Sequence, residues 1–507
     1  MRDDLKSDLQ GGAASAPLSL DDLFRRTLAR QPDALALIDP PNKLQVSGER
    51  PQQLTYAQAD CAISAIASQF QEAGLPTGSI IALQLPNTIE FPIALLAAIR
   101  AGLVVALLPQ LWRQSDLAAA LNKVSARAIV GMGHIEIVDH GDIAMNAAAE
   151  AFSVRHVFGF GKNLPDGMTR LTVDAKDTHV PPLHTPFDPQ RPAIVSFDVT
   201  ADGMCAVPRN HSHLIAAGLA VTLESALPDG AKILSTIAPA SFGGMATSMV
   251  PWLLSGGSLS LYHAGALHVF ERDMIAGQQH DVLVAPSLLA LRLAHEGAFA
   301  EASSISHVIG VWRAPERMAS SDDWPTSAAR LTDICLFGEI GLIAATRFEN
   351  GSPAPIKSGL QLSPRANPGS RIVGELSITP KGTLAMKGAM VPLAAYRATT
   401  ANDAFDGAMD RADTGYAAKT DKRTGAIDIA APPAGLFAVG GYRFLAHDLD
   451  QWSQRLGAGV TLAALPDQLN GHRLAGRATD ARRVREALGE LGLNPLMVDA
   501  FRERVKS

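Results

Sequence analysis

The sequence predicts an α/β protein with a large N-terminal domain and a smaller C-terminal one. Helical repeats of apolar residues alternate with short apolar runs, which is typical of a largely parallel sheet covered by helices. A chain of 507 residues is longer than the chains that usually fold around a single hydrophobic core. Prolines also interrupt the chain at 430–435. We therefore predict a disordered tail at 1–17, a large domain at 18–433 with a β-rich subdomain at 340–430, and a shortened α+β lid at 435–507.

The individual elements follow from the spacing of apolar residues. Leu20, Leu23 and Leu28 have helical spacing, and Ser19 before them is a suitable N-cap, so we predict a helix at 18–30. Runs of apolar residues that end at glycine, proline or asparagine predict buried strands. The same criteria predict helices at 57–73, 93–100, 116–124, 241–254, 288–295 and 482–491, and strands at 78–85, 102–108, 126–131, 193–197, 233–239, 259–262 and 281–286.

Composition excludes several classes of protein. The formal net charge of −6 argues against nucleic acid or an anionic membrane surface as the main partner. Cys61, Cys205 and Cys335 are too widely spaced for a disulfide framework or a metal cluster, so no metal site is predicted from them. No secretory signal opens the sequence and no apolar run reaches the ~20 residues of a membrane span. We expect a cytoplasmic protein without a membrane span.

The stretch 197–211 joins a predicted strand to the start of a predicted helix. Loops at such places commonly collect backbone N–H groups around a phosphate. This one has a single glycine, Gly203, no lysine, and the two carboxylates Asp198 and Asp202. By itself it is read as a surface turn.

The neighbouring motifs give this turn a context. The sequence has L-T-Y at 54–56, G-x-x-x-A-x-x-L-P-N at 78–87, A-G-x-V-x-x-L-x-P at 101–109 and V-G-E-L at 373–376. With these motifs the chain resembles the adenylate-forming (AMP-binding) superfamily, in particular its acyl- and aryl-CoA ligases. The resemblance implies the adenylate-forming-enzyme fold and, in an active ligase, the use of ATP, Mg²⁺ and CoA.

The phosphate loop of that family, T-S-G-T-T-G-x-P-K-G-V-x-x-T-H, aligns with 197–211 but is largely rewritten. This sequence keeps the motif residues at Thr200, Val207 and His211, whereas Cys205 occupies the position of the motif's lysine. Two of the motif's glycine positions are occupied by Val199 and Ala206, and its proline position is occupied by Met204. The resemblance thus assigns to the nucleotide site the degenerate positions Thr200, Asp202, Gly203 and Cys205.

Three further nucleotide motifs are also altered. In the family's Y-G-x-T-E motif, Phe337 and Gly338 keep the aromatic residue and the glycine, but Gly341 stands at the magnesium-binding glutamate. Glu339 lies two residues early, which displaces a side chain by ~6–7 Å in an extended chain. Tyr416 occupies the position of the family's ribose-binding aspartate, and Pro432 occupies the position of an arginine in the family's pattern. The segment with the family's terminal catalytic lysine is not found, and Lys506 has no matching context.

The positions that the resemblance assigns to the acyl group are better kept. Its pocket would be lined by Phe242, Gly243, Gly244, Trp312, Arg313 and Ala314, and the pantetheine side by Gly440, Gly441 and Tyr442. Trp312 and Arg313 replace a glycine pair and would fill part of the cavity unless they point outward. Phe242 is equally compatible with a residue of the core.

Two classes of function remain open at this stage. The chain is either a ligase homologue that has lost ATP-dependent activation and binds an acyl group, a thioester or a partner, or a divergent but active AMP-forming ligase. The first needs no cofactor and the second needs ATP, Mg²⁺ and CoA. Expected partners are a small acid or acyl thioester, a carrier protein, or an active homologous subunit. A Cys205–His211 nucleophile pair is a weaker alternative.

Overall fold

The computed structural model describes residues 18–173, 188–263, 280–299, 304–325, 329–365, 370–396, 410–467 and 471–502. The predicted tail at 1–17 and Lys506 lie outside these ranges. Within them, every helix is too short or too polar to cross a membrane.

The N-terminal part contains a seven-stranded sheet of described strands. Its order is β7-β6-β5-β3-β4-β8-β9, with parallel pairing throughout except between β8 and β9. The strands are β3 (Ile80–Leu83), β4 (Val104–Leu107), β5 (Ala128–Met132), β6 (His156–Phe160), β7 (Thr169–Arg170), β8 (Ile194–Thr200) and β9 (Gly203–Arg209). The helix α4 (Tyr56–Glu72) precedes β3, and the helices between the strands are α5 (Glu90–Arg100), α6 (Gln114–Val124) and α7 (His140–Glu150).

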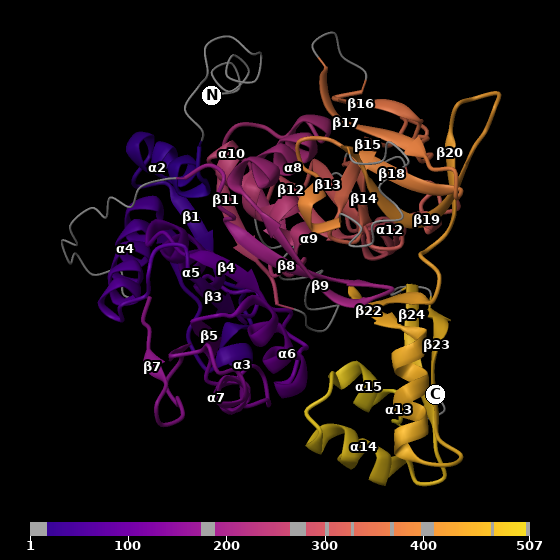
Figure 1. The fold of residues 1–507 in the computed structure, drawn as a ribbon. Coiled ribbons are helices and arrows are strands. Elements are labelled where there is room, and N and C mark those ends of the chain that lie inside the picture. The colour runs from indigo at the N-terminus through magenta and orange to yellow at the C-terminus, as the bar shows by residue number, and fades with distance from the viewer. Residues whose placement is uncertain are drawn as a thin grey trace.

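Helices cover both faces of this sheet. Alternate residues of a strand face opposite sides, so Ile81 and Leu83 of β3 join the core around α4 and α5, whereas Ala82 joins the cluster around α6 and α7. All residues of α5 are buried, because this helix is surrounded by protein on every side. The predicted helix-covered parallel sheet is confirmed (Figure 1).

A second sheet has eight described strands in the order β15-β14-β13-β12-β10-β11-β1-β2, with antiparallel strands only at its two edges. They are β1 (Leu35–Ile38), β2 (Gln53–Thr55), β10 (Lys232–Ser235), β11 (Ser258–Leu261), β12 (Val282–Pro286), β13 (His307–Trp312), β14 (Arg330–Phe337) and β15 (Gly341–Thr346). Its helices include α2 (Leu20–Arg30), α8 (His211–Glu224) and α12 (Ser287–His295). Ser19 caps α2 as predicted, since its side chain accepts a hydrogen bond from the Asp22 N–H.

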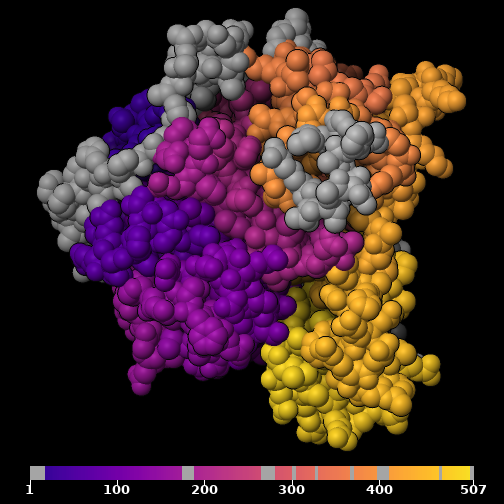
Figure 2. Space-filling model, in the orientation of Figure 1, coloured from indigo at the N-terminus to yellow at the C-terminus, as the bar shows by residue number. Residues whose placement is uncertain are grey.

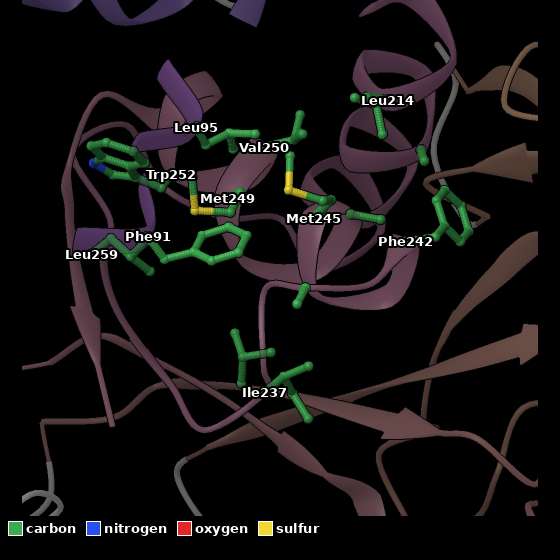
Figure 3. Packing of buried hydrophobic residues seen from close by; sticks show 14 of the residues in the cluster. Phe91, Leu95, Leu214, Ile237, Phe242, Met245, Met249, Val250, Trp252 and Leu259 are labelled. Atoms are coloured by element: carbon green, nitrogen blue, oxygen red, sulfur yellow. The ribbon is translucent and has the colours of Figure 1, made fainter. Parts of the chain in front are cut away.

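The helix predicted at 241–254 is not a regular α-helix. It consists of α9 (Phe242–Gly244), a π-helical turn (Met245–Met249) and α10 (Val250–Ser255). Figure 3 shows Met249 and Trp252 from this segment in the same buried cluster as Phe91 and Leu95 of α5. The segment thus belongs to the core that joins the two large sheets.

The remaining strands form two antiparallel sheets. The first contains β16 (Gly359–Ser363), β17 (Arg371–Ile378), β18 (Thr383–Lys387), β19 (Ala412–Thr420) and β20 (Ile427–Ala431). The second, in the order β22-β21-β24-β23, contains β21 (Leu436–Val439), β22 (Tyr442–Leu445), β23 (Thr461–Asp467) and β24 (Gly471–Arg477). Between β20 and β21 the chain passes through Pro432 and Pro433, and no strand pairing in the described chain joins these two sheets.

The C-terminal segment, residues 435–502, has a hydrophobic core of its own. Leu474, Leu488, Met497 and Phe501 are among its buried residues. Its helices are α13 (Ala446–Leu456), α14 (Ala481–Glu490) and α15 (Pro495–Asp499). Figure 2 shows this segment, in yellow, against the N-terminal part, with the surface hollowed between them.

Candidate ligand-binding cleft and the altered nucleotide site

The stretch that aligns with the phosphate loop is a β-hairpin. Strands β8 and β9 pair from Ile194↔Arg209 to Thr200↔Gly203, so only Ala201 and Asp202 form the turn. Gly203 follows the turn with a φ of +94°, which favours glycine. The backbone N–H of Asp202 faces the Thr200 hydroxyl at 3.3 Å. The backbone here is used in strand pairing and does not form an open row of N–H donors for phosphate.

Asp198, on β8, is the centre of a buried polar cluster. Its side chain is 3% exposed and pairs with the Arg443 guanidinium, with an Nη1–Oδ1 distance of 2.8 Å. The Tyr396 hydroxyl and the Glu339 N–H donate to its other oxygen at 3.0 and 3.1 Å. Both carboxylate oxygens therefore have protein partners.

Arg443 reaches this cluster from β22 in the C-terminal segment. Its Nη2 donates to the Tyr416 hydroxyl at 3.1 Å. Gly338 lies directly beside it, because a Cβ built on Gly338 would be 2.4 Å from Nη1 of Arg443. Although burial opposes the charge, Asp198 and Tyr416 hold the pKa of Arg443 above its usual value.

This one guanidinium joins three positions that the sequence motifs place at the nucleotide. Asp198 belongs to the phosphate-loop stretch, Gly338 to the Y-G-x-T-E motif, and Tyr416 stands at the ribose-binding aspartate. Phe337 packs edge-on against the Tyr416 ring, with centroids 5.4 Å apart, and Gly341 pairs with Phe337 across β14 and β15. The space between these motifs is thus occupied by protein atoms.

The Glu339 carboxylate contacts other protein groups. One of its oxygens accepts from the Phe242 N–H at 3.1 Å and lies 3.7 Å from Arg209. Burial raises the pKa of Glu339, and the nearby Arg209 charge opposes that rise. Among the described residues, no group of three or more His, Cys, Asp or Glu side chains could hold a metal ion.

The predicted acyl-pocket residues of the 239–245 region pack against protein. Phe242 is fully buried, and the Arg209 guanidinium lies 4.1 Å from the centre of its ring. A Cβ on Gly243 would be 2.5 Å from Leu336, and one on Gly244 would be 2.1 Å from the Ala238 carbonyl oxygen. These glycines permit close packing of α9 in the core.

Trp312 and Arg313 point to different surroundings. Trp312 is buried, and its indole N–H donates to Asp333 at 2.7 Å. Arg313 is half-buried and lines two adjacent cavities, of about 240 and about 120 Å³. Ala314 lines the smaller of the two. Trp312 belongs to the core and lines only the smaller cavity, whereas Arg313 lines both cavities.

The larger cavity, which we call the cleft, lies between the N-terminal part and the C-terminal segment. The two sides meet at Tyr442, whose hydroxyl accepts from the Leu111 N–H at 3.1 Å. Gly441 lines both cavities and Gly440 only the smaller one. Apolar side chains of the cleft include Trp112, Phe197, Leu336, Phe444, Leu449 and Trp452. Thus the structure brings the predicted pantetheine-side residues and Arg313 together.

The remaining predicted residues have ordinary roles. Thr200 is the last residue of β8, next to the hairpin turn, and Pro432 is half-buried between β20 and β21. The Cys205 thiol lies 3.8 Å from the Ala395 carbonyl oxygen, and burial raises its pKa. His211 accepts from the Leu20 N–H through Nδ1 at 3.2 Å, and burial lowers its pKa to about 4. Neither observation supports a Cys205–His211 nucleophile pair.

Arg443 and Tyr396 were not identified from the sequence. Arg443 directly follows the recognisable 440–442 motif, but nothing local indicates its partner, which is 245 residues away in the chain. Tyr396, likewise, is 198 residues from Asp198. The two carboxylates in the phosphate-loop stretch were the available signal that a cation would be required nearby.

A family model described as "AMP-binding enzyme" matches residues 24–331. The chain belongs to this family. The match covers more than half of the 507 residues and includes the β8–β9 hairpin and Arg313. Membership of the adenylate-forming superfamily, expected from the motifs, is confirmed.

Curated relatives match in shorter regions. The chain is 34% identical over 110 residues to the medium-chain fatty-acid–CoA ligase of Escherichia coli K12, covering 22% of this chain and 18% of the relative. It is 27% identical over 201 residues to the salicyl-AMP ligase / salicyl-S-ArCP synthetase of Mycobacterium tuberculosis, covering 39% and 34%. The aligned regions thus span about a third or less of these relatives.

Two solved structures of the superfamily share the fold over nearly the whole chain. Apo MbtA from Mycobacterium smegmatis has a TM-score of 0.65 at 17% identity, covering 97% of this chain and 92% of that one. The amide bond synthetase McbA from Marinactinospora thermotolerans has a TM-score of 0.69 at 15% identity, covering 95% and 94%. At these identities the likeness establishes the architecture alone.

Proposed function

We propose that this member of the AMP-binding family has lost ATP-dependent carboxylate activation and binds a small acid, or its thioester, without adenylating it. The observation that carries the proposal is the Asp198–Arg443–Tyr416 cluster at the nucleotide-motif positions. A carrier protein or an active homologous subunit is the corresponding proposal for a protein partner.

The residues at these positions do not fit ATP and Mg²⁺. Adenylation builds negative charge in its transition state and needs preorganised N–H donors, a metal ion and a cationic side chain. Here Cys205 and Gly341 stand at the lysine and at the metal-binding glutamate, and Glu339 is held by Arg209 and the Phe242 N–H. We derive no adenylation step for this chain.

A triphosphate would also meet unfavourable charge. To enter, it would have to displace Arg443 from Asp198, which would leave a buried carboxylate without its cation. Each close pair of like charges costs ~1–4 kcal/mol, depending on its exposure. These terms oppose nucleotide binding even where the surrounding fold is kept.

The apolar cleft supports the binding half of the proposal. Its aromatic and aliphatic lining can bury apolar surface of a ligand, and this contributes ~25 cal/mol of binding free energy per Å² buried. That contribution does not depend on phosphate-binding groups. The cleft is therefore compatible with an acyl or aryl ligand although the nucleotide motifs are altered.

We expect neither ATP·Mg²⁺ nor AMP to bind at sub-millimolar concentration. Isothermal titration calorimetry measures this directly, and pyrophosphate exchange with a panel of aliphatic and aromatic acids measures activation. Saturable heats with ATP·Mg²⁺, or exchange stimulated by any acid, would show that the activation chemistry is intact.

The alternative is a divergent but active AMP-forming ligase. Its support is membership of the family together with the retained cleft. Acid-stimulated pyrophosphate exchange, followed by transfer to CoA, is the result that this alternative requires. In that case the Asp198–Arg443 pair would have to open during turnover.

A further inference from the structure

Arg313 is the cation of the cleft that has no ion-pair partner in the described part of the chain. Its closest polar contacts are the Gly441 carbonyl oxygen and the Ser241 hydroxyl, both at 3.5 Å. Charge-assisted hydrogen bonds are usually 2.7–2.9 Å long, so both contacts are weak. A half-buried guanidinium held only in this way has unused donor capacity.

Two other arginines near the cleft lie close to carboxylates. Arg443 pairs with Asp198 at 2.8 Å, and Arg209 lies 3.7 Å from Glu339. Asp198 keeps the Arg443 pKa high, whereas burial lowers the pKa of Arg313 and the more distant Glu339 only partly opposes this. Arg313 therefore bears a desolvation cost that an incoming anion would offset.

The position of Arg313 suits a ligand with one charged end. The arginine lies where the cleft and the smaller cavity meet, beside Gly441, whose Cβ, if present, would be 3.0 Å from its Nε. The cleft is also lined by Phe197, Trp112 and Trp452. A ligand that reaches Arg313 with an anion can place an apolar body against these rings.

We propose that Arg313 anchors the carboxylate of a small aryl or short-chain acyl acid in the cleft, and that it makes the site selective for monoanionic acids. This inference rests on the proposed function and specifies its ligand. The planar guanidinium can donate two parallel hydrogen bonds to a carboxylate, which a lysine cannot.

The charges of the cleft favour a single negative charge on the ligand. Besides Arg313 and Arg443, its described lining includes the carboxyl groups of Asp116, Asp198, Glu339 and Asp448. Arg443 and Arg209 offset Asp198 and Glu339, but Asp116 and Asp448 would repel a polyanion such as a coenzyme A thioester, whereas a monocarboxylate needs only Arg313. A volume of about 240 Å³ also suits a ligand smaller than the drug-sized molecules that occupy pockets of ~300–1,000 Å³.

The test is a ligand-observed NMR titration of the full chain without nucleotide. The probes are benzoate, butanoate, the neutral analogue benzamide, and benzoyl-CoA. We expect benzoate and butanoate to bind, and benzamide and benzoyl-CoA to bind about tenfold or more weakly than benzoate. Arg313→Gln should weaken acid binding by about tenfold or more, and Arg313→Lys by less.

Arg482→Gln is the matched control, because Arg482 of α14 lines neither cavity and pairs with Glu486 on the surface at 2.9 Å. We expect this variant to bind the acids as the unaltered chain does. Thermal denaturation of each free protein checks folding, and Arg313→Gln should melt no lower than the unaltered chain because it removes an unpaired charge.

The outcomes separate this inference from the proposed function. Equal binding of benzoate and benzamide, or equal losses in Arg313→Gln and Arg482→Gln, would overturn the anchor role while leaving non-catalytic binding intact. Tighter binding of benzoyl-CoA than of benzoate would overturn the selectivity for acids. Pyrophosphate exchange, measured separately, would overturn the proposed function itself.

Discussion

At the scale of single residues, buried polar side chains hold distant segments together. Lys43 is completely buried and contacts both Asp39 and Glu90, at 2.7 and 2.6 Å. Asp333 accepts from Trp312 and pairs with Arg347 at 2.8 Å. An unpaired buried charge is costly. Removing one partner of a buried ion pair therefore destabilises the folded protein more than removing one partner of an exposed pair.

His211 gives a pH-dependent prediction. Its folded pKa of about 4 lies below the ordinary value of 6.5, so the unfolded chain binds more protons between these values. His211 therefore contributes stability above pH 6.5 that is lost as the pH falls toward 4, by up to about 3 kcal/mol. In His211→Asn, whose amide oxygen can still accept from the Leu20 N–H, this loss should be absent.

Urea unfolding at pH 4.5 and 7.5 measures the effect. We expect the difference between the two midpoints to be smaller in His211→Asn than in the unaltered chain. His140 and His263, whose pKa values burial lowers to about 3 and about 4, are present in both proteins and cancel in the comparison. An unchanged difference would contradict the assigned contribution of His211.

At the scale of elements, glycines allow helices and turns to approach one another closely. Gly244 in α9 faces the Ala238–Pro239 turn, and Gly218 in α8 faces Val250, where an added Cβ would lie 2.3 Å away. These approaches join the 242–255 segment to α8 and to the eight-stranded sheet. Backbone on one side of such a contact cannot move aside as a flexible side chain can.

Gly244→Ala is predicted to be strongly destabilising. Its Cβ would be 2.1 Å from the Ala238 carbonyl oxygen and 2.7 Å from the Pro239 Cα, so the backbone would have to shift. We expect a loss of about 2 kcal/mol or more in the free energy of unfolding, measured by urea denaturation.

The control for this substitution is Gly489→Ala in α14. Nothing lies within 4 Å of a Cβ built on Gly489. Alanine is favoured over glycine within a helix by about 0.5–1 kcal/mol, so this variant should be neutral or slightly more stable. Similar losses in both variants would mean that the contact at Gly244 does not limit packing.

At the scale of the whole molecule, the C-terminal segment is held against the rest by a few polar contacts around the cleft. Arg443 pairs with Asp198, Tyr442 accepts from Leu111, and Arg317 donates to Asp467. Figure 1 shows β22 beside the β8–β9 hairpin, where the first of these contacts forms. We propose that residues 435–507 form a separate lid domain and that the Asp198–Arg443 pair keeps it closed.

Arg443→Gln should release this lid. It leaves Asp198, which is 3% exposed, without its cation, and breaking such a pair costs about 3–5 kcal/mol. We expect faster limited proteolysis at 430–435 and increased hydrogen exchange in β21 and β22. Asp198→Asn combined with Arg443→Gln removes both charges and should be less perturbed than Arg443→Gln alone.

Arg482→Gln is the control for the lid prediction. Arg482 and its partner Glu486 are 88% and 59% exposed, and exposed pairs contribute about 1 kcal/mol or less. This variant should be cleaved at the same rate as the unaltered chain. If Arg443→Gln is also cleaved at that rate, the ion pair does not hold the lid.

The sequence by itself determined the architecture and the altered motifs. Apolar repeats identified α2, α4 and seven strands of the two large sheets, because the periods of helices and strands are set by local backbone geometry. They did not identify β1, β6, β13 and β14. Motif positions such as Cys205 and Gly341 could be read directly, since the landmarks around them are kept. The interruption between β20 and β21 at Pro432–Pro433 also followed from local chemistry, whereas a domain boundary there stays a prediction.

Only the tertiary structure decided what fills the altered site. Asp198 and Arg443 are 245 residues apart, and no local pattern indicates that they meet. Trp312 and Arg313 are neighbours in sequence and both line the smaller cavity, but Trp312, the last residue of β13, is buried in the core, whereas only Arg313 reaches the cleft. Long-range charge pairing and side-chain direction depend on how the sheets and the C-terminal segment pack, which short-range periodicity does not encode.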